Sequence, residues 1–179
     1  MSAPTRRELL SRSTAVSDEG TLHDTLAVEQ IVVFAYEHVL AHVALAPRTA
    51  SVVGRFAAHE RAHVNALTLA LSERGGSPPA APADVSAADD ALATRDFSQR
   101  LVEVRNDVLA IDFLFGLEGL AEGAQFTAIA KLRDLVLVRA AAQMMAAEGQ
   151  HAAILGLLKH PGEPARAVPS AFVEGQHQH

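Results

Sequence analysis

The sequence predicts an all-α protein, a bundle of four helices in a single domain. The chain has 179 residues, which is enough to bury a substantial core without disulfides or a structural metal. Hydrophobic residues make up 49% of it but aromatic residues only 4%, and Ala and Leu carry most of the apolar fraction. Such a composition favours packed helices over a sandwich of β-sheets.

Cysteine is absent from the chain, which excludes disulfides, rubredoxin-type iron sites, zinc ribbons, iron–sulfur ligation and thiol nucleophiles. A metal site would therefore draw on His, Asp and Glu. The formal charge of −6 and the lack of a basic cluster argue against nucleic acid or anionic lipid as a partner. No apolar run approaches the roughly 18 residues of a membrane helix, so we expect a soluble protein with no membrane partner.

The first residues are polar, and we expect an irregular segment over residues 1–20. The stretch Thr5-Arg6-Arg7-Glu8-Leu9-Leu10 is similar to the start of a twin-arginine export signal. The ten residues after it contain no apolar core of the kind that such signals need. The sequence therefore favours the cytoplasm, with Arg6-Arg7 as a chance match or a relic of an export signal.

Helical periodicity begins after this segment, and the predicted bundle spans residues 21–159. The inner stripe of the first helix consists of Leu22, Leu26, Glu29, Val33, Tyr36, Leu40 and Val43. Residues 46–49 interrupt the pattern, with Thr49 as the predicted N-cap of the second helix. The inner stripe of that helix, which ends at Gly75-Gly76, consists of Val53, Phe56, Glu60, His63, Leu67 and Ala70.

One long connection, from residue 77 to about residue 94, predicts a crossover along the bundle between the second and third helices, with a short helix near residues 86–93. The third helix is predicted over residues 97–130, with Val108, Ile111, Phe115, Glu118, Glu122, Gln125 and Ile129 inside. The fourth places Leu137, Ala141, Met144, Glu148, His151, Leu155 and Leu158 inside. Residues 160–179 form a tail without helical periodicity, expected to lie along the bundle or to be mobile.

The inner stripes carry the same polar pattern twice. Glu29 precedes Glu60-x-x-His63 by nearly the same separation as Glu118 precedes Glu148-Gly-Gln-His151. Residues three apart project from nearly the same face of a helix, so each Glu/His pair can bind one ion. Glutamates from the other helices could then bridge two ions, in a carboxylate-rich site that suits iron or manganese. Without metal, each buried charge would cost several kcal/mol.

This doubled pattern resembles the ferritin-like di-iron carboxylate proteins, in particular small rubrerythrin-related and ferritin-like-domain proteins of bacteria, over residues 22–158. Leu26-Ala-Val-Glu29 with Phe34-Ala35-Tyr36 looks like the first helix of such proteins, and Met145-Ala-Ala-Glu148-Gly-Gln-His151-Ala looks like the last. The resemblance implies a ferritin-like four-helix bundle with two iron ions and Glu60 and Glu148 in the bridging role. The ligands that it implies are Glu29, Glu60, His63, Glu118, Glu148 and His151.

The resemblance also gives Glu122 and Tyr36 a place near the site. Glu122 could be the extra carboxylate that rubrerythrins carry on this helix, and Tyr36 could form a hydrogen bond to the site. From the residues alone, Glu122 can equally be a partly solvated helix residue, whereas Tyr36 is better explained as a core residue with a satisfied hydroxyl group.

The activity that the resemblance implies is a reaction of Fe(II) with O2 or peroxide, by a ferroxidase or a peroxide-scavenging oxidoreductase. The chain departs from the family in having no rubredoxin domain, which leaves its electron supply unexplained. It also lacks the fifth helix of the storage-cage ferritins, which argues against a mineral-storing shell. A homodimer could form through an Ala-rich helix face.

Two other interpretations stay open. His59-Glu60-x-x-His63 is also the motif of zinc peptidases, with two zinc ligands and a glutamate as general base. That interpretation needs a third ligand downstream and a helix backed by a sheet, and the sequence has no convincing strand pattern. In a bundle, His59 lies off the inner stripe and its mutation should do least. The third interpretation is a metal-free interaction bundle whose core carboxylates are protonated or paired.

Overall fold

The computed structural model describes residues 6–168, with the side chains of residues 18–168. The regular elements of this part are all helical, which confirms the predicted all-α class for it. They are α1 (Arg6–His42), α2 (Pro47–Ser72), α3 (Val85–Ala93), α4 (Asp107–Lys131) and α5 (Leu135–Lys159), with the 3-10 helices η1 (Leu101–Glu103) and η2 (Pro164–Ala167). Across residues 6–168, no helix combines the length and the apolar character needed to cross a membrane.

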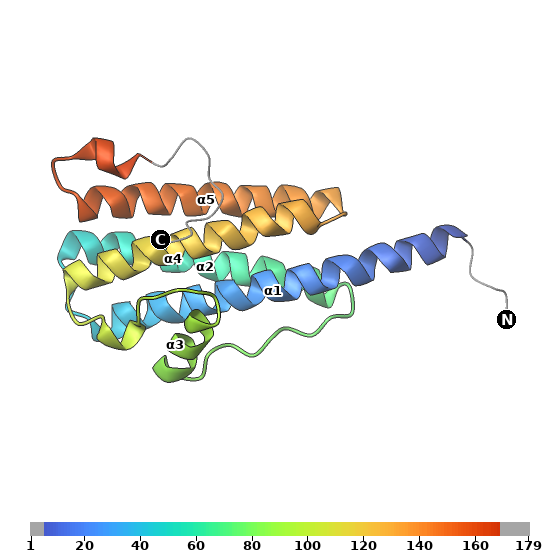
Figure 1. Cartoon of the computed structure of the whole chain (residues 1–179), viewed down its shortest axis with the longest axis horizontal. Coiled ribbons are helices and arrows are strands. Elements are labelled where there is room, and N and C mark those ends of the chain that lie inside the picture. The colour runs from blue at the N-terminus through green and yellow to red at the C-terminus, as the bar shows by residue number, and fades with distance from the viewer. Residues whose placement is uncertain (1–5, 169–179) are drawn as a thin grey trace.

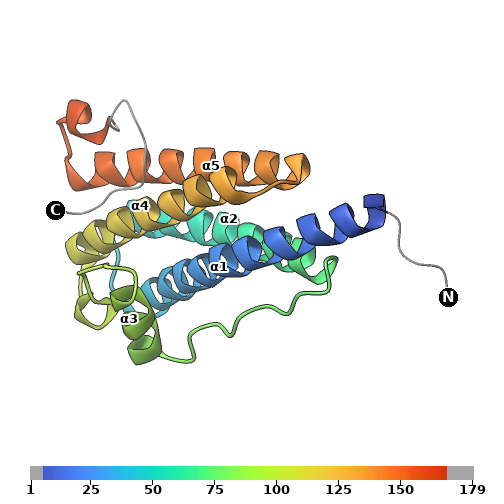
Figure 2. The same ribbon diagram turned by 45° about the vertical axis from the view of Figure 1, so that its right-hand side comes forward.

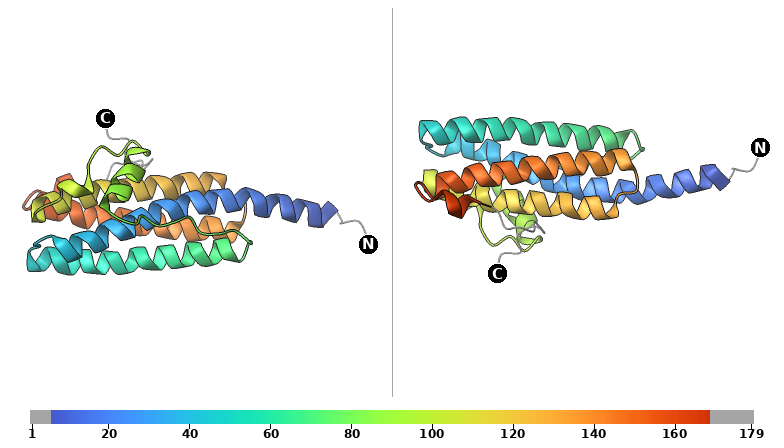
Figure 3. Two further views of the ribbon diagram at one scale, coloured as in Figure 1. Left: turned by 90° about the horizontal axis from the view of Figure 1, so that it is seen from below. Right: turned by 90° about the horizontal axis from the view of Figure 1, so that it is seen from above.

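The four longer helices lie side by side, and the short α3 lies outside them (Figure 1). α1 packs against α2 and α4, and α5 packs against α4 and α2. Short connections make α1 and α2 antiparallel, and likewise α4 and α5. After α2 the chain returns along α1 to α3, so that α2 and α4 run in the same direction (Figure 2). The two views of Figure 3 show that α1 extends past the other helices at its N-terminal end.

The core consists of two apolar clusters, one toward each end of the bundle. One contains Val53 and Leu114, and the other contains Leu26, Leu67 and Met144, together with similar side chains from the same helices. On α2 and α5, the residues between the two clusters include the buried acidic side chains of Glu60 and Glu148, and on α4 they include the buried amide of Gln125. The polar positions of the inner stripes therefore form a layer between two apolar ends.

The expectation of an irregular segment over residues 1–20 is wrong for residues 6–20, because α1 begins at Arg6. Residues 1–5 lie outside the described part. The stretch has no proline and a single glycine, Gly20, so its helix propensity is not interrupted, while its polar composition hides it from a hydrophobic periodicity. Asp18, with 1% of its area exposed, accepts hydrogen bonds from the backbone N–H groups of Arg133 (2.9 Å) and Asp134 (3.0 Å). These bonds tie α1 to the start of α5.

The predicted N-cap of the second helix is also wrong, because α2 begins at Pro47 with Ala46 as a cap that makes no side-chain hydrogen bond. Asp107, at the start of α4, binds this end instead. Its Oδ1 accepts from the Ala46 N–H (2.8 Å), and its Oδ2 accepts from the hydroxyl group of Thr49 (3.2 Å). A single carboxylate thus fastens the α1–α2 connection to α4.

Residues 97–106 were predicted as the first turns of the third helix, but α4 begins only at Asp107. The buried carboxylate of Asp89 on α3 accepts a hydrogen bond from the Leu101 N–H (2.6 Å) and so holds this stretch against α3. Asn106 then caps α4 by accepting from the Leu109 N–H (3.0 Å). The predicted short helix near residues 86–93 is α3.

Of the predicted tail, residues 160–168 are described, and they pack on α5 through η2. Ala167 lies against Gly156 of α5, where a Cβ atom would come within 3.1 Å of the Ala167 backbone. Glycine at this position therefore allows the close approach. Residues 169–179, with the histidines near the end of the chain, lie outside the described part.

Candidate metal centre

The layer between the two apolar clusters brings together all six ligands that the sequence analysis proposed. The six side chains are Glu29 on α1, Glu60 and His63 on α2, Glu118 on α4, and Glu148 and His151 on α5. The four glutamates have no exposed area, and the two histidines are nearly buried, with 12% and 3% of their side chains exposed. All four long helices contribute because each turns its inner stripe toward the same layer.

A first group of possible ligands surrounds His63. Its Nδ1 lies 2.9 Å from Glu148 Oε1, 3.3 Å from Glu60 Oε2 and 3.7 Å from Glu29 Oε2. One ligand atom from each of these four residues lies within 4.8 Å of the others, so the group could hold a metal ion. The pair Glu60 and His63 comes from one face of α2, as their spacing of three residues requires.

A second group surrounds His151 in the same way. Its Nδ1 lies 2.9 Å from Glu60 Oε1, 3.2 Å from Glu118 Oε2 and 3.4 Å from Glu148 Oε2. These four residues also offer one ligand atom each within 4.8 Å. Glu60 and Glu148 therefore belong to both groups. Each of them has one oxygen near His63 and its other oxygen near His151.

The atoms of the two groups that could bind metal are only partly satisfied by the protein itself. Among the described residues, both oxygens of Glu60 and of Glu148, Glu29 Oε2 and His63 Nδ1 have no partner at hydrogen-bonding geometry, despite the short distances. Leaving a buried polar group unpaired costs about 1–3 kcal/mol, and more for a charged group. Carboxylate oxygens and imidazole nitrogens are ligands that iron and manganese accept. The six residues therefore fit a site for two metal ions.

The family model described as ferritin-like domain matches residues 17–160. The chain belongs to the ferritin-like domain family. The matched segment takes in α2 to α5, most of α1 and all six residues of the two groups. No curated protein and no solved structure gives a significant match.

The titratable side chains in the cluster of this ferritin-like domain have strongly shifted pKa values, in different directions. Burial opposes charge on His63 and His151, but the carboxylates around them outweigh it and raise the pKa of His63 to about 12 and the pKa of His151 to about 11. Burial also opposes charge on Glu148, but its contacts with the two histidines lower its pKa to about 2. Burial raises the pKa of Glu29 to about 8 and that of Glu118 well above its usual range. Metal binding therefore has to displace protons from both histidines and from the glutamates whose pKa values are raised.

Two uncharged side chains hold carboxylates of the cluster in place. The buried Tyr36 donates its hydroxyl hydrogen to Glu118 Oε1, so it is a core residue that also forms a hydrogen bond to the cluster. Gln125, also with no exposed area, donates from Nε2 to Glu29 Oε1 at 2.6 Å. The sequence placed Gln125 on the inner stripe two turns beyond Glu118 but assigned it no role. Its role could have been predicted from the position of a polar amide on the same inner stripe as Glu118.

His59 lies at the surface of the ferritin-like domain, but it is not remote from the cluster. Its Nδ1 is 3.0 Å from His151 Nε2, on the side of the ring that faces away from the carboxylates. Phe56 stacks on the same ring, with 4.0 Å between the ring centres. The zinc-peptidase interpretation would place His59 and His63 on one ion, whereas His59 belongs to neither ligand group.

Glu122 is half-buried and lies beside the cluster without belonging to either ligand group. Its Oε1 is 3.3 Å from the position that a Cβ atom would take on Gly149. Glycine next to Glu148 therefore leaves room for this carboxylate. Burial, followed by the charge of Glu148, raises the pKa of Glu122.

Proposed function

We propose that this ferritin-like domain binds two iron ions and reacts them with O2 or peroxide, as a ferroxidase or a peroxide-scavenging oxidoreductase. The observation that carries the proposal is that Glu60 and Glu148 belong to both ligand groups. Each of them has one oxygen near His63 and the other near His151. Such sharing is what two adjacent ions need and what a single zinc ion does not. Bound iron would supply the electrons that reduce O2 or peroxide, and manganese is the alternative metal.

Each residue of the cluster has a distinct part in this proposal. Glu29 and His63 would bind one ion and Glu118 and His151 the other, while Glu60 and Glu148 bridge them. Four carboxylates offset the four positive charges of two divalent ions, which keeps the buried layer near neutrality. The apolar clusters on either side exclude water from the layer.

We also infer that the four long helices are the four-helix bundle of this family and that the segment between α2 and α4 is its crossover. The parallel course of α2 and α4 and the return of the chain along α1 support this inference. With this order, each hairpin supplies one glutamate and one Glu/His pair to the same layer.

The test is elemental analysis of the purified protein, followed by anaerobic titration with Fe(II) and exposure to O2. We expect about two iron ions per chain and the absorption band of an oxo-bridged ferric pair. Tight binding of a single zinc ion would overturn the proposal. Absence of stoichiometric metal, under conditions that load other di-iron proteins, would instead favour the metal-free bundle.

A further inference from the structure

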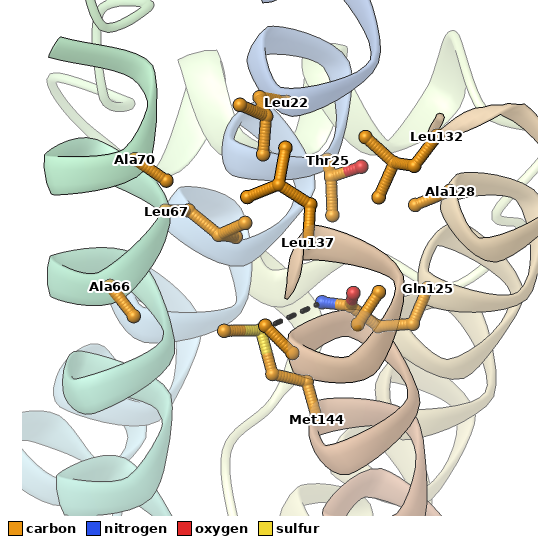
Figure 4. Close-up of a pocket in the computed structure, with 12 residues that line it drawn as sticks. Leu22, Thr25, Ala66, Leu67, Ala70, Gln125, Ala128, Leu132, Leu137 and Met144 are labelled. Atoms are coloured by element: carbon orange, nitrogen blue, oxygen red, sulfur yellow. Dashed lines mark hydrogen bonds between the residues drawn. The ribbon is translucent and has the colours of Figure 1, made fainter. Parts of the chain in front are cut away.

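An apolar pocket of about 40 Å³ lies among α1, α2, α4 and α5 (Figure 4). One of its lining residues, Gln125, donates a hydrogen bond to Glu29 of the metal-ligand cluster. Thr25 and Met144, which line it, come one helical turn before Glu29 and Glu148. Leu67, on the opposite side, comes one turn after His63. The pocket is thus next to the cluster along three of the four helices.

The floor of the pocket is a buried amide that touches the cluster. Gln125 donates from Nε2 to Glu29 Oε1 at 2.6 Å and contacts Met144 Sδ at 3.6 Å, the contact drawn in Figure 4. Its Oε1 has no hydrogen-bond partner among the described residues, although the side chain has no exposed area. A single side chain therefore separates the pocket from a proposed iron ligand.

The lining selects against water. Apart from Gln125 and Thr25 it consists of Leu, Ala and Met side chains, and the hydroxyl group of Thr25 already donates to the Thr21 carbonyl oxygen at 2.8 Å. A buried water typically needs two to four polar partners, whereas apolar cavities stay dry and take up apolar guests, such as xenon or benzene in a cavity of about 150 Å³. A pocket of about 40 Å³ suits a much smaller guest than benzene.

The pocket also has a way out. Ala66 on α2 is exposed and Ala140 on α5 is half-buried, and both belong to its lining. Small side chains facing one another across the α2 and α5 interface leave a passage that larger ones would close. A small apolar molecule could enter there and reach Gln125 without crossing the polar layer.

We propose that this pocket binds dioxygen and holds it beside Glu29, at the edge of the metal-ligand cluster. The inference rests on the proposed function, because it assigns to the pocket one of the oxidants named there. It favours O2 over peroxide, since the lining offers a peroxide at most two acceptors, Gln125 Oε1 and Thr25 Oγ1, and no free donor in return for its lost hydration.

Xenon serves as the probe of the pocket, because it is apolar and visible by anomalous diffraction. Crystals of the full chain, with and without metal, are pressurised with xenon, and we expect a peak between Leu67, Leu137 and Met144 in both. Ala66→Leu should close the passage and abolish this peak. Ala62→Leu, the same change at an exposed position one turn earlier on α2, is the matched control and should keep it.

The second measurement is the rate at which the Fe(II)-loaded protein reacts with O2. We expect the rate constant of Ala66→Leu to fall by about tenfold relative to Ala62→Leu, the lower end of the range by which a misfit of one methylene in an apolar pocket changes a rate. Ala141→Val, which fills the pocket from inside, should act in the same direction.

Absence of xenon from the wild-type pocket, or an ordered water in its place, overturns the proposal. So does an Ala66→Leu protein that loses xenon but reacts with O2 as fast as the control. If the chain binds no iron, the proposed function and the dioxygen assignment fail together. Metal analysis identifies that failure of iron binding. The xenon peak in the metal-free crystal does not depend on iron, so it tests the pocket separately.

Discussion

Replacing Glu60 by glutamine should weaken both metal positions at once, because Glu60 has one oxygen in each ligand group. Glutamine keeps the size of the side chain but loses its charge and one ligand oxygen. A ligand that binds only the folded protein stabilises it by about 2.7 kcal/mol at one hundred times its Kd. For a chain of this length, about 1 kcal/mol corresponds to roughly 2–4 °C in Tm. Each ion should therefore raise Tm by about 5–11 °C under these conditions.

The assay is thermal unfolding with and without Mn(II) in the absence of O2, together with metal counts on the same samples. The wild-type protein should show the contributions of two ions, and Glu60→Gln should lose most of both. Glu29→Gln, which removes a ligand from the first group alone, should keep roughly half of the shift. Glu103→Gln, an exposed glutamate on η1, is the control and should behave as the wild type.

Retention of two ions and of the full Tm shift in Glu60→Gln would refute the bridging role. A Glu29→Gln protein that loses both ions would also contradict the division into two groups. It would mean that the carboxylates act as one undivided site.

Four further predictions concern the cluster, in three cases, and the contact of α1 with the start of α5, in the fourth. Without metal the pKa values of His63, His151 and Glu29 are raised to about 12, about 11 and about 8, and that of Glu118 is raised as well, so loading should release more than two protons per chain at pH 7. Calorimetry in buffers of different ionisation enthalpy gives this proton count, and the metal affinity should rise with pH. The raised pKa values of the two histidines stabilise the metal-free fold fully below pH 6.5 and progressively less at higher pH. The Tm of the metal-free protein should therefore fall as the pH rises above 7, and a flat profile would contradict this expectation. His59→Ala should lower metal affinity about tenfold in a chelator competition, because His59 orients His151, while His23→Ala at an exposed position should not. Asp18→Ala should lower the free energy of unfolding by about 1–3 kcal/mol in urea, because it leaves two backbone N–H groups without their acceptor; an unchanged midpoint would show that water replaces it.

The cluster could be anticipated from the sequence because its cause is local. Burying a glutamate on a stripe of leucines and valines costs free energy unless a metal ion or another group binds its carboxylate. Residues three apart on a helix also share a face. The repetition of Glu and Glu-x-x-His then identified which polar positions belong together. The positions of Glu29 and Glu148 in the structure follow directly from this periodicity.

The features that escaped prediction depend on contacts between distant segments. Nothing near Asp18 in the sequence shows that its carboxylate binds backbone groups at residues 133 and 134, and so the helix around it went unrecognised. The start of α4 was misplaced because Asp89 holds residue 101, where the 3-10 helix η1 begins, against α3 instead of in line with α4. His59 was judged by its distance from the stripe, whereas its ring reaches the far nitrogen of His151.

The membership of Glu60 and Glu148 in both ligand groups also affects how the two helical hairpins are held together. These residues belong to two different hairpins, α1 with α2 and α4 with α5, which the chain joins covalently only through the segment between residues 72 and 107. Each ligand group draws on both hairpins, so every bound ion would act as a cross-link between them. A nick in that segment should then leave the metal-loaded halves associated, and removal of the metal should weaken their hold on each other. Metal content would thus govern how firmly the two halves of the molecule are joined.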